Sequence, residues 1–217
     1  MSEASRFPTR PKEESLFITS AGEQPVSLEA RFSEGTKPWA CVLCHPHPLH
    51  GGTMQNKVID TALRGIAAEG FSTLRFNFRG AGKSEGTHGE GIAEVDDLRG
   101  AIQYMKERTQ PEAIMLIGFS FGTGVISRYL SDGGECDGVV LLAPPLSMYA
   151  LPTFEVPAKW GLHMFLGAND EFCDVASFRA HQHNFKGEVR AEVLEDAEHF
   201  FHGKLIELAE FVRGSVG

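Results

Sequence analysis

The stretch "IMLIGFSFGTGVISRYL", residues 114–130, joins an apolar run to a helix-like pattern through a serine flanked by glycines. The apolar run predicts a strand over 113–118, and the spacing that follows predicts a helix over 121–131. The glycines two positions before and after Ser120 would let strand and helix approach closely, because glycine has no Cβ to clash. Two interpretations are open, a nucleophile on a tight turn or a serine in a bend, since Gly-x-Ser-x-Gly arises readily in a chain with 24 glycines.

Length and composition limit the class of protein around this turn. A chain of 217 residues that is 42% hydrophobic predicts one domain, placed at 15–217 after a flexible polar segment at 1–14. A net charge of −9 without a basic block argues against nucleic acid and anionic membranes as partners. No apolar stretch has the length of a signal peptide core or of a membrane span, and four cysteines are too few for a disulfide scaffold. We therefore expect a cytoplasmic enzyme-sized domain.

Strands and helices alternate on both sides of residue 120. Apolar or alternating runs predict strands over 16–18, 26–32, 39–44, 71–78, 113–118, 138–143, 162–166 and 188–194. Amphipathic spacing predicts helices after an N-cap at Thr53, over 92–108, 121–131 and 174–184, and around 205–212. This alternation predicts an α/β fold with a mostly parallel sheet of about seven to eight strands, helices on both faces and an N-terminal antiparallel hairpin at one edge.

An acid and a histidine follow two later strands, where ligands bind in sheets of this class. Asp170 comes just past 162–166, and His199 comes just past 188–194. The order serine, acid, histidine, each after a successive strand, is that of an α/β-hydrolase triad. In that chemistry His199 takes the proton of Ser120, and Asp170 holds the imidazole tautomer. Three other acids are candidates for this role. Asp174 is expected to cap the helix that follows it, and Asp196 and Glu198 are too close to His199 in sequence to reach its Nδ1 easily.

Acyl transfer at Ser120 also needs donors for an oxyanion. The backbone N–H of Phe121, the residue after the nucleophile, is the first expected donor. The second should come from the loop after strand 39–44, where Pro46 and Pro48 have no N–H. This leaves the backbone N–H of His47 or, as the less favoured alternative, of Leu49.

The same loop raises the question of a metal site. Its candidate ligands are Cys41, Cys44, His45, His47 and His50. The two cysteines are three apart in a strand and so point to opposite faces, which argues against a zinc site and for small buried thiols. Residues 80–84 end like a phosphate-binding loop, but Asn77 stands where the motif requires glycine. We therefore predict no metal and no cofactor.

Two longer motifs carry a resemblance to a known family. The loop "HPHPLHGGTMQNKV" at 45–58 and the stretch "RFNFRGAGKSEG" at 75–86 resemble signatures of small, lidless, mainly bacterial α/β-hydrolases related to dienelactone hydrolases. The resemblance covers about residue 15 to the end and implies Ser120, Asp170 and His199 as the triad. Dienelactone hydrolase itself has a cysteine nucleophile, so serine here makes that substrate doubtful.

The length of one connection bears on the substrate. Residues 143–161, where related enzymes insert a cap domain, could hold only a loop or one short helix. This predicts an open, shallow site without a cap. The side chains expected to line it come from the first loop, the elbow and this connection: His50, Phe119, Phe121, Leu146, Met148 and Tyr149. For Phe119 and the others of the apolar set, ordinary core packing is the alternative.

These observations lead to one preferred function and two alternatives. We expect hydrolysis of esters or thioesters of small or accessible acyl groups through an acyl-serine intermediate. A peptidase or amidase and a non-catalytic binding protein of the same fold are the alternatives. The partner is a small-molecule substrate, and both a monomer and a homodimer are open. We also expect Arg75, a charge inside a strand, to pair with Asp96 or Asp97.

Overall fold

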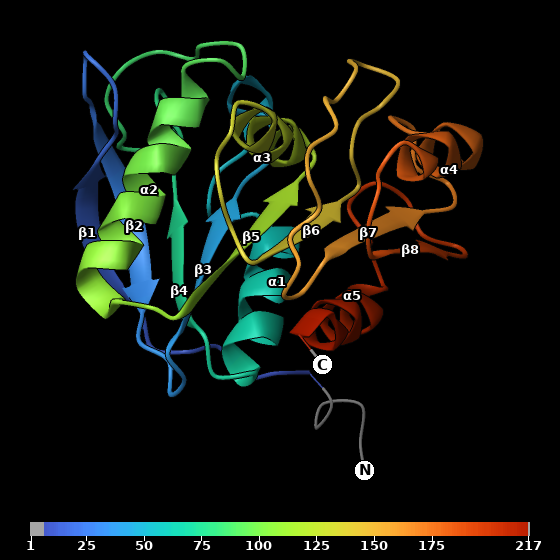
Figure 1. The fold of residues 1–217 in the computed structure, drawn as a ribbon, viewed down its shortest axis with the longest axis horizontal. Coiled ribbons are helices and arrows are strands. Elements are labelled where there is room, and N and C mark those ends of the chain that lie inside the picture. The colour runs from blue at the N-terminus through green and yellow to red at the C-terminus, as the bar shows by residue number, and fades with distance from the viewer. Residues whose placement is uncertain (1–6, 217) are drawn as a thin grey trace.

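The computed structural model describes residues 7–216, which form one eight-stranded sheet with helices on both faces (Figure 1). The strand order is β1-β2-β4-β3-β5-β6-β7-β8. The strands are β1 (Glu14–Thr19), β2 (Ser27–Ser33), β3 (Trp39–Cys44), β4 (Ser72–Phe76), β5 (Ala113–Phe119), β6 (Gly138–Leu142), β7 (Leu162–Gly167) and β8 (Val189–Leu194). The helices are α1 (Lys57–Ala68), α2 (Glu94–Thr109), α3 (Phe121–Ser131), α4 (Val175–His183) and α5 (Leu205–Arg213), with 3-10 turns at Pro48–His50 and Gly214–Val216.

The pairing of the strands confirms the predicted sheet. β1 pairs with β2, and β2 with β4, in antiparallel fashion, while all pairs from β4 through β8 are parallel. The chain leaves β3 toward β4 on one side and returns to β5 on the other, so the strand order reverses beside β3. In open α/β sheets the crevice for ligands lies at such a point, outside the carboxyl ends of the strands. Cys44 at the end of β3 lies opposite Gly118 near the end of β5, which brings the two predicted loops together.

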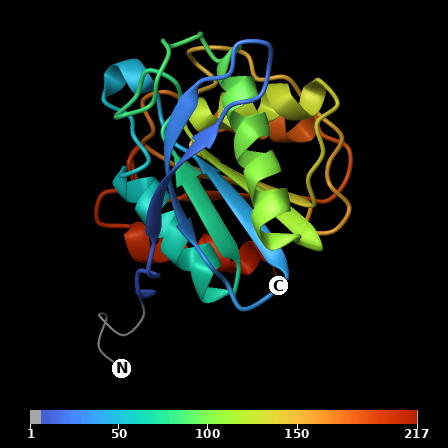
Figure 2. The same cartoon turned by 90° about the vertical axis from the view of Figure 1, so that its left-hand side faces the viewer.

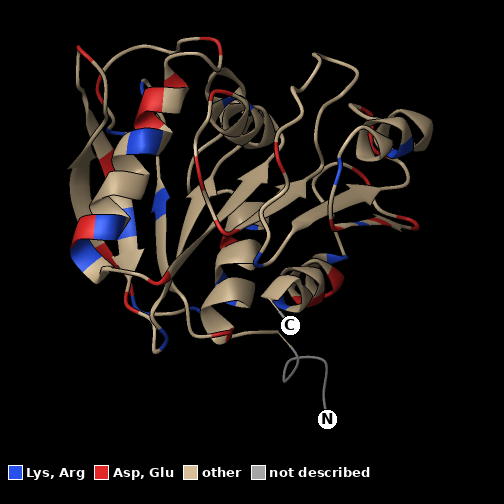
Figure 3. Cartoon of the chain, viewed as in Figure 1, with Lys and Arg blue, Asp and Glu red and all other residues tan. Residues whose placement is uncertain are grey.

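Two apolar layers enclose the sheet. One face packs against α2, α3 and α4, and the other packs against α1 and α5 (Figure 2). All seven residues of β5 are buried, as expected for a central strand covered on both faces. Charged side chains gather on helices and loops, and the central strands carry few of them (Figure 3). No helix within 7–216 has the length and apolarity needed to cross a bilayer.

The connection between β6 and β7 holds no helix or strand, so no cap domain covers the sheet. Residues 143–161 cross the carboxyl edge as a loop, which confirms the prediction of a lidless fold.

The start of α1 differs from the prediction. Asn56, and not Thr53, caps this helix, because the Asn56 side chain accepts the Val58 N–H at 2.9 Å. Thr53 lies in a preceding turn, where Asn77 Oδ1 accepts the Met54 N–H at 2.8 Å.

The predicted ion pair of Arg75 is wrong. Arg75 is buried and donates to Glu13 at 2.7 Å, with Asp60 of α1 at 3.3 Å. The reason is the alternation of side chains along β4, since Leu74 faces the α2 layer and Arg75 faces the opposite one. Asp97 of α2 pairs instead with Arg79, just beyond the strand, at 2.7 Å.

The pairing of Glu13 also bears on the segment expected at 1–14. Residues 1–6 of that segment lie outside the described residues. Glu13 buries its carboxylate against Arg75, and Glu14 begins β1. The last two residues of the segment are therefore part of the fold.

We expect Glu13→Gln to lower the free energy of unfolding by about 2–3 kcal/mol, because removing one partner leaves the buried Arg75 guanidinium undercompensated. Glu14→Gln is the matched control, since Glu14 pairs with Arg108 in solvent and such pairs contribute under about 1 kcal/mol. Urea unfolding of both variants measures the difference. Equal stability of the two variants would contradict the structural role given to Glu13.

Candidate active site

Ser120 occupies a strained turn between β5 and α3. Its backbone has φ 52° and ψ −119°, a region that L-residues rarely adopt and that costs on the order of 1–3 kcal/mol. A Cβ at Gly118 would lie 2.7 Å from the Gly122 backbone, and one at Gly122 would lie 2.3 Å from the Cys44 carbonyl oxygen. Both glycines are thus required by close backbone contacts, and Ser120 lies on a tight strand-to-helix turn. The turn lifts the serine hydroxyl above the carboxyl edge of the sheet.

The structure brings Ser120, His199 and Asp170 together from the ends of β5, β8 and β7. His199 Nε2 lies 3.0 Å from Ser120 Oγ, and His199 Nδ1 lies 2.8 Å from Asp170 Oδ2. Because Nδ1 faces a carboxylate, it carries the ring proton and donates it, which leaves Nε2 to accept the serine O–H. Asp170 is held in turn, since its other oxygen accepts the Phe172 N–H at 2.8 Å.

The other acids weighed from the sequence are occupied elsewhere. Asp174 caps α4 by accepting the Ser177 N–H at 2.8 Å. Glu198 accepts the backbone N–H groups of Phe200 and His202 at 3.1 and 2.7 Å. Asp196 has a positive φ of 55° in the turn after β8. None of the three hydrogen-bonds with the His199 ring, so Asp170 is its partner.

Three phenylalanine rings surround the His199 imidazole. Phe119, Phe172 and Phe200 have centroids 5.1, 4.6 and 5.1 Å from it. Phe119 is fully buried behind the imidazole and does not line the cavities at the site, contrary to the expectation that it forms a substrate wall. The reason is that the strand continues through Phe119, whose side chain joins the core on the α1 side. The sequence alone did not identify Phe172, two residues after Asp170, or Phe200, directly after His199, as residues of the site.

The first loop presents one free backbone donor beside the elbow. Within residues 7–216, no acceptor is hydrogen-bonded to the N–H of His47 or to that of Phe121. The alternative donor, the Leu49 N–H, is directed at His47 Nδ1 at 3.2 Å. A Cβ at Gly52 would lie 2.1 Å from the Pro46 oxygen, so this glycine is needed for the tight fold of the loop. The rings of His47 and Phe121 are in contact, with centroids 4.9 Å apart.

His45 braces the same loop from below. Its ring is completely buried, donates from Nδ1 to the Pro46 oxygen at 2.6 Å and accepts the Phe78 N–H at Nε2 at 2.9 Å. Burial lowers the pKa of His45 to about 4. The ring is thus neutral at physiological pH and ties the loop after β3 to the loop after β4.

This burial predicts a pH dependence of stability. The unfolded chain protonates His45 near pH 6.5 and the folded chain only near pH 4, so the stabilisation is complete above 6.5 and is lost as pH falls toward 4. Between pH 7 and pH 5 we expect the free energy of unfolding to fall by about 2 kcal/mol because of this group. Urea unfolding across this range measures it. His45→Gln should flatten the dependence of the unfolding free energy on pH. His202→Gln, a change at an exposed ring, should leave that dependence as it is. The same pH dependence in both variants would contradict the role given to His45.

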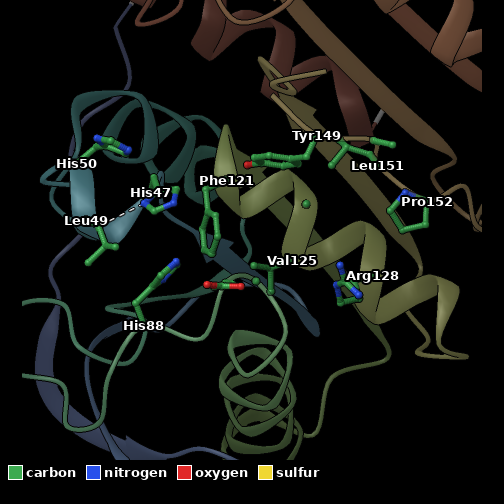
Figure 4. Close-up of a pocket in the computed structure, with 14 residues that line it drawn as sticks. His47, Leu49, His50, His88, Phe121, Val125, Arg128, Tyr149, Leu151 and Pro152 are labelled. Carbon is green, nitrogen blue, oxygen red and sulfur yellow. Dashed lines mark hydrogen bonds between the residues drawn. The ribbon is translucent and has the colours of Figure 1, made fainter. Parts of the chain in front are cut away.

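Two adjoining cavities open at the site, and Figure 4 shows the larger of them. The smaller, of about 180 Å³, contains Ser120 and His199 and is lined in part by His50 and Met148, as expected. The larger, of about 500 Å³, shares His47, His50 and Tyr149 with it. Leu146 packs against the core and lines neither cavity, contrary to expectation. Burial, together with the neighbouring imidazoles, lowers the pKa of His47, which favours the neutral form of this ring.

The two cysteines of β3 lie in the core, as small apolar residues do. Cys41 packs in the layer under α1 and Cys44 in the layer under α3, and burial raises the pKa of both thiols. In the described part of the chain, no three side chains of the ligand types come close enough to hold a metal ion.

Comparison with known proteins agrees with this architecture. Residues 40–166 match the family model described as serine aminopeptidase, S33. An α/β serine hydrolase homologue from Coxiella burnetii is 31% identical with a TM-score of 0.81 over 94% of this chain and 97% of its own. A serine hydrolase without a lid from Xanthomonas campestris is 29% identical with a TM-score of 0.83 over 94% of each chain. An uncharacterized protein of Rickettsia prowazekii is 28% identical over 85% of this chain and 82% of its own. The chain therefore belongs to the family described as serine aminopeptidase S33, and its fold is that of the α/β serine hydrolases that lack a lid.

Proposed function

We propose that the protein is a serine hydrolase that cleaves carboxylic esters or thioesters through an acyl-serine intermediate. The observation that carries this proposal is the continuous hydrogen-bonded arrangement of Ser120, His199 and Asp170, at 3.0 and 2.8 Å, in an open cavity. A neutral serine is a weak nucleophile and needs a base within hydrogen-bond reach, which His199 Nε2 provides.

The proposed reaction has two halves. Ser120 Oγ attacks the carbonyl carbon while His199 takes the hydroxyl proton, and Asp170 stabilises the resulting imidazolium. His199 then protonates the departing alcohol or thiol, which leaves the acyl group on Ser120. A water molecule attacks this ester, passes its proton to His199, and Ser120 recovers that proton as the acid is released.

The N–H groups of Phe121 and His47 are the proposed donors to the oxyanion of both tetrahedral intermediates. Phe121 begins α3, so its N–H has no helical partner and adds the positive end of the helix dipole. Donors that are already oriented need no reorganisation as negative charge develops, and each contributes on the order of 3 kcal/mol to such reactions.

The site favours esters over peptides because nothing beyond the sheet encloses a long leaving group. Residues 143–161 form a loop without a cap, and the catalytic cavity measures only about 180 Å³. The description of the matching family names an aminopeptidase, which makes aminoacyl amides the second substrate class to test. A cytoplasmic location and the choice between monomer and homodimer stay predictions.

The test combines covalent labelling with a substrate panel. We expect a fluorophosphonate probe to label the protein, with the mass increase located on Ser120, and p-nitrophenyl esters of short acids to be hydrolysed faster than the aminoacyl p-nitroanilides. Faster cleavage of the anilides would favour the aminopeptidase. Absence of labelling together with inertness toward every ester and anilide would instead support a non-catalytic binding protein.

A further inference from the structure

The larger cavity begins where the catalytic cavity ends. The two share His47, His50 and Tyr149, so a group attached to Ser120 can extend from one into the other. A volume of about 500 Å³ falls within the range of about 300–1,000 Å³ found for small-molecule sites. The catalytic mechanism uses only Phe121 and His47 from its lining. The cavity is therefore available to hold part of the substrate.

Helix α3 supplies one wall of this cavity. Phe121, Gly124, Val125 and Arg128 all line it, and their spacing of three, four and seven residues places them on one helix face. A Cβ at Gly124 would lie 3.2 Å from the Tyr149 ring and 3.3 Å from Leu151, so glycine lets the loop of residues 149–152 lie close against the helix. The path along this face is mainly apolar.

Arg128 stands at the far end of that path. Figure 4 shows its side chain on the opposite side of the cavity from the three histidines, with Phe121 and Val125 between. Seven residues separate Phe121 from Arg128, which is about 10 Å along a helix axis. Among the described residues, no carboxylate forms an ion pair with Arg128. The guanidinium is thus available to a ligand.

Apart from the histidines, the only other acidic or basic side chain in this lining is that of Glu90. It belongs to the loop before α2, next to Gly91, which lies against the Phe121 ring in this cavity. A carboxylate entering the cavity would be repelled from Glu90 and attracted to Arg128. Because the whole chain carries a net charge of −9, only a local cation of this kind would favour an anionic substrate.

We propose that the larger cavity binds the acyl group of the substrate and that Arg128 recognises a carboxylate at its distal end. The preferred substrates would then be monoesters or monothioesters of dicarboxylic acids with an aliphatic chain. A guanidinium binds a carboxylate through two parallel N–H donors, which adds orientation to charge attraction. The leaving alcohol or thiol departs through the open catalytic cavity. This inference rests on the proposed esterase chemistry and names its substrate class.

The test compares three p-nitrophenyl esters of equal chain length that differ only in the terminal group: adipate monoester, hexanoate and 6-aminohexanoate. We expect kcat/KM for the adipate monoester to exceed that for hexanoate by about fivefold, mainly through KM. The gain is modest because the Arg128 side chain is exposed, and solvent weakens ion pairs of exposed groups. Arg128→Gln should bring this ratio close to one, and Arg128→Lys should restore part of it. Arg99→Gln, at an exposed arginine of α2, should leave all three rates unchanged.

The outcomes separate this inference from the proposed function. If hexanoate is hydrolysed but the adipate monoester is no better, or Arg128→Gln leaves their ratio unchanged, the carboxylate site is refuted and the esterase stands. If 6-aminohexanoate is preferred and Glu90→Gln removes that preference, the cavity binds cations and the inference is also overturned. If no ester reacts and Ser120 stays unlabelled, the proposed function itself fails.

Discussion

Ser120→Ala is expected to lower kcat/KM for a short-chain p-nitrophenyl ester by about 10⁴-fold or more, because alanine cannot form the acyl intermediate. The oxyanion donors and the cavity would remain, so the residual rate should exceed the uncatalysed reaction. Labelling by the fluorophosphonate probe should disappear in the same variant. Steady-state kinetics and intact-protein mass spectrometry measure the two effects independently.

The matched control for this variant lies on the same helix. Ser127 of α3 is fully buried, and its hydroxyl has no hydrogen-bond partner in the described part of the chain, so Ser127→Ala removes an oxygen without removing an interaction. We expect this variant to keep both activity and labelling. If Ser120→Ala kept its activity, or if both variants lost activity equally, Ser120 would not be the nucleophile.

Asp170→Asn is expected to lower kcat by about 10⁴-fold with little change in KM or in stability. The asparagine oxygen can still accept the Phe172 N–H, so its amide nitrogen must face His199 Nδ1. An N–H donor at that position forces the ring proton onto Nε2, the nitrogen that faces Ser120. The imidazole then points a proton at the serine hydroxyl and cannot act as a base.

Asp174→Asn tests the same chemical change outside this arrangement. Asp174 is exposed and caps α4, where asparagine is an equally good N-cap, so activity should be retained. Kinetics and urea unfolding of both variants separate loss of function from loss of fold. Equal activity of Asp170→Asn and the wild type would show that another group orients His199.

Much of the fold follows from local patterns. The apolar runs and the amphipathic spacing are properties of neighbouring residues, and all eight predicted strands are present, with β3 at Trp39–Cys44 as predicted. That Ser120, Asp170 and His199 lie close together could be expected, because parallel strands end at one edge of a sheet. The same rule brought the loop after β3 beside the elbow.

The predictions that were wrong concern interactions between residues that are distant in sequence. Nothing near Arg75 indicates that its side chain faces Glu13 and Asp60, because the partner depends on which layer covers that side of β4. Thr53 has the chemistry of a cap, yet a hydrogen bond from the Met54 N–H to Asn77 holds that turn, and the helix begins after Asn56.

The sequence by itself determined the order of strands and helices, the elbow at Ser120 and the choice of acid and histidine, because each rests on chemistry and spacing along the chain. Only the tertiary structure decided which side chains line the cavities at the site. Phe119 was expected to line the site, with core packing as the alternative, and it lies behind His199. Arg128 was not expected there, and it lines a cavity together with residues 149–152 of the β6–β7 connection. A cavity is the space left when distant segments pack, so no local pattern in the sequence encodes it.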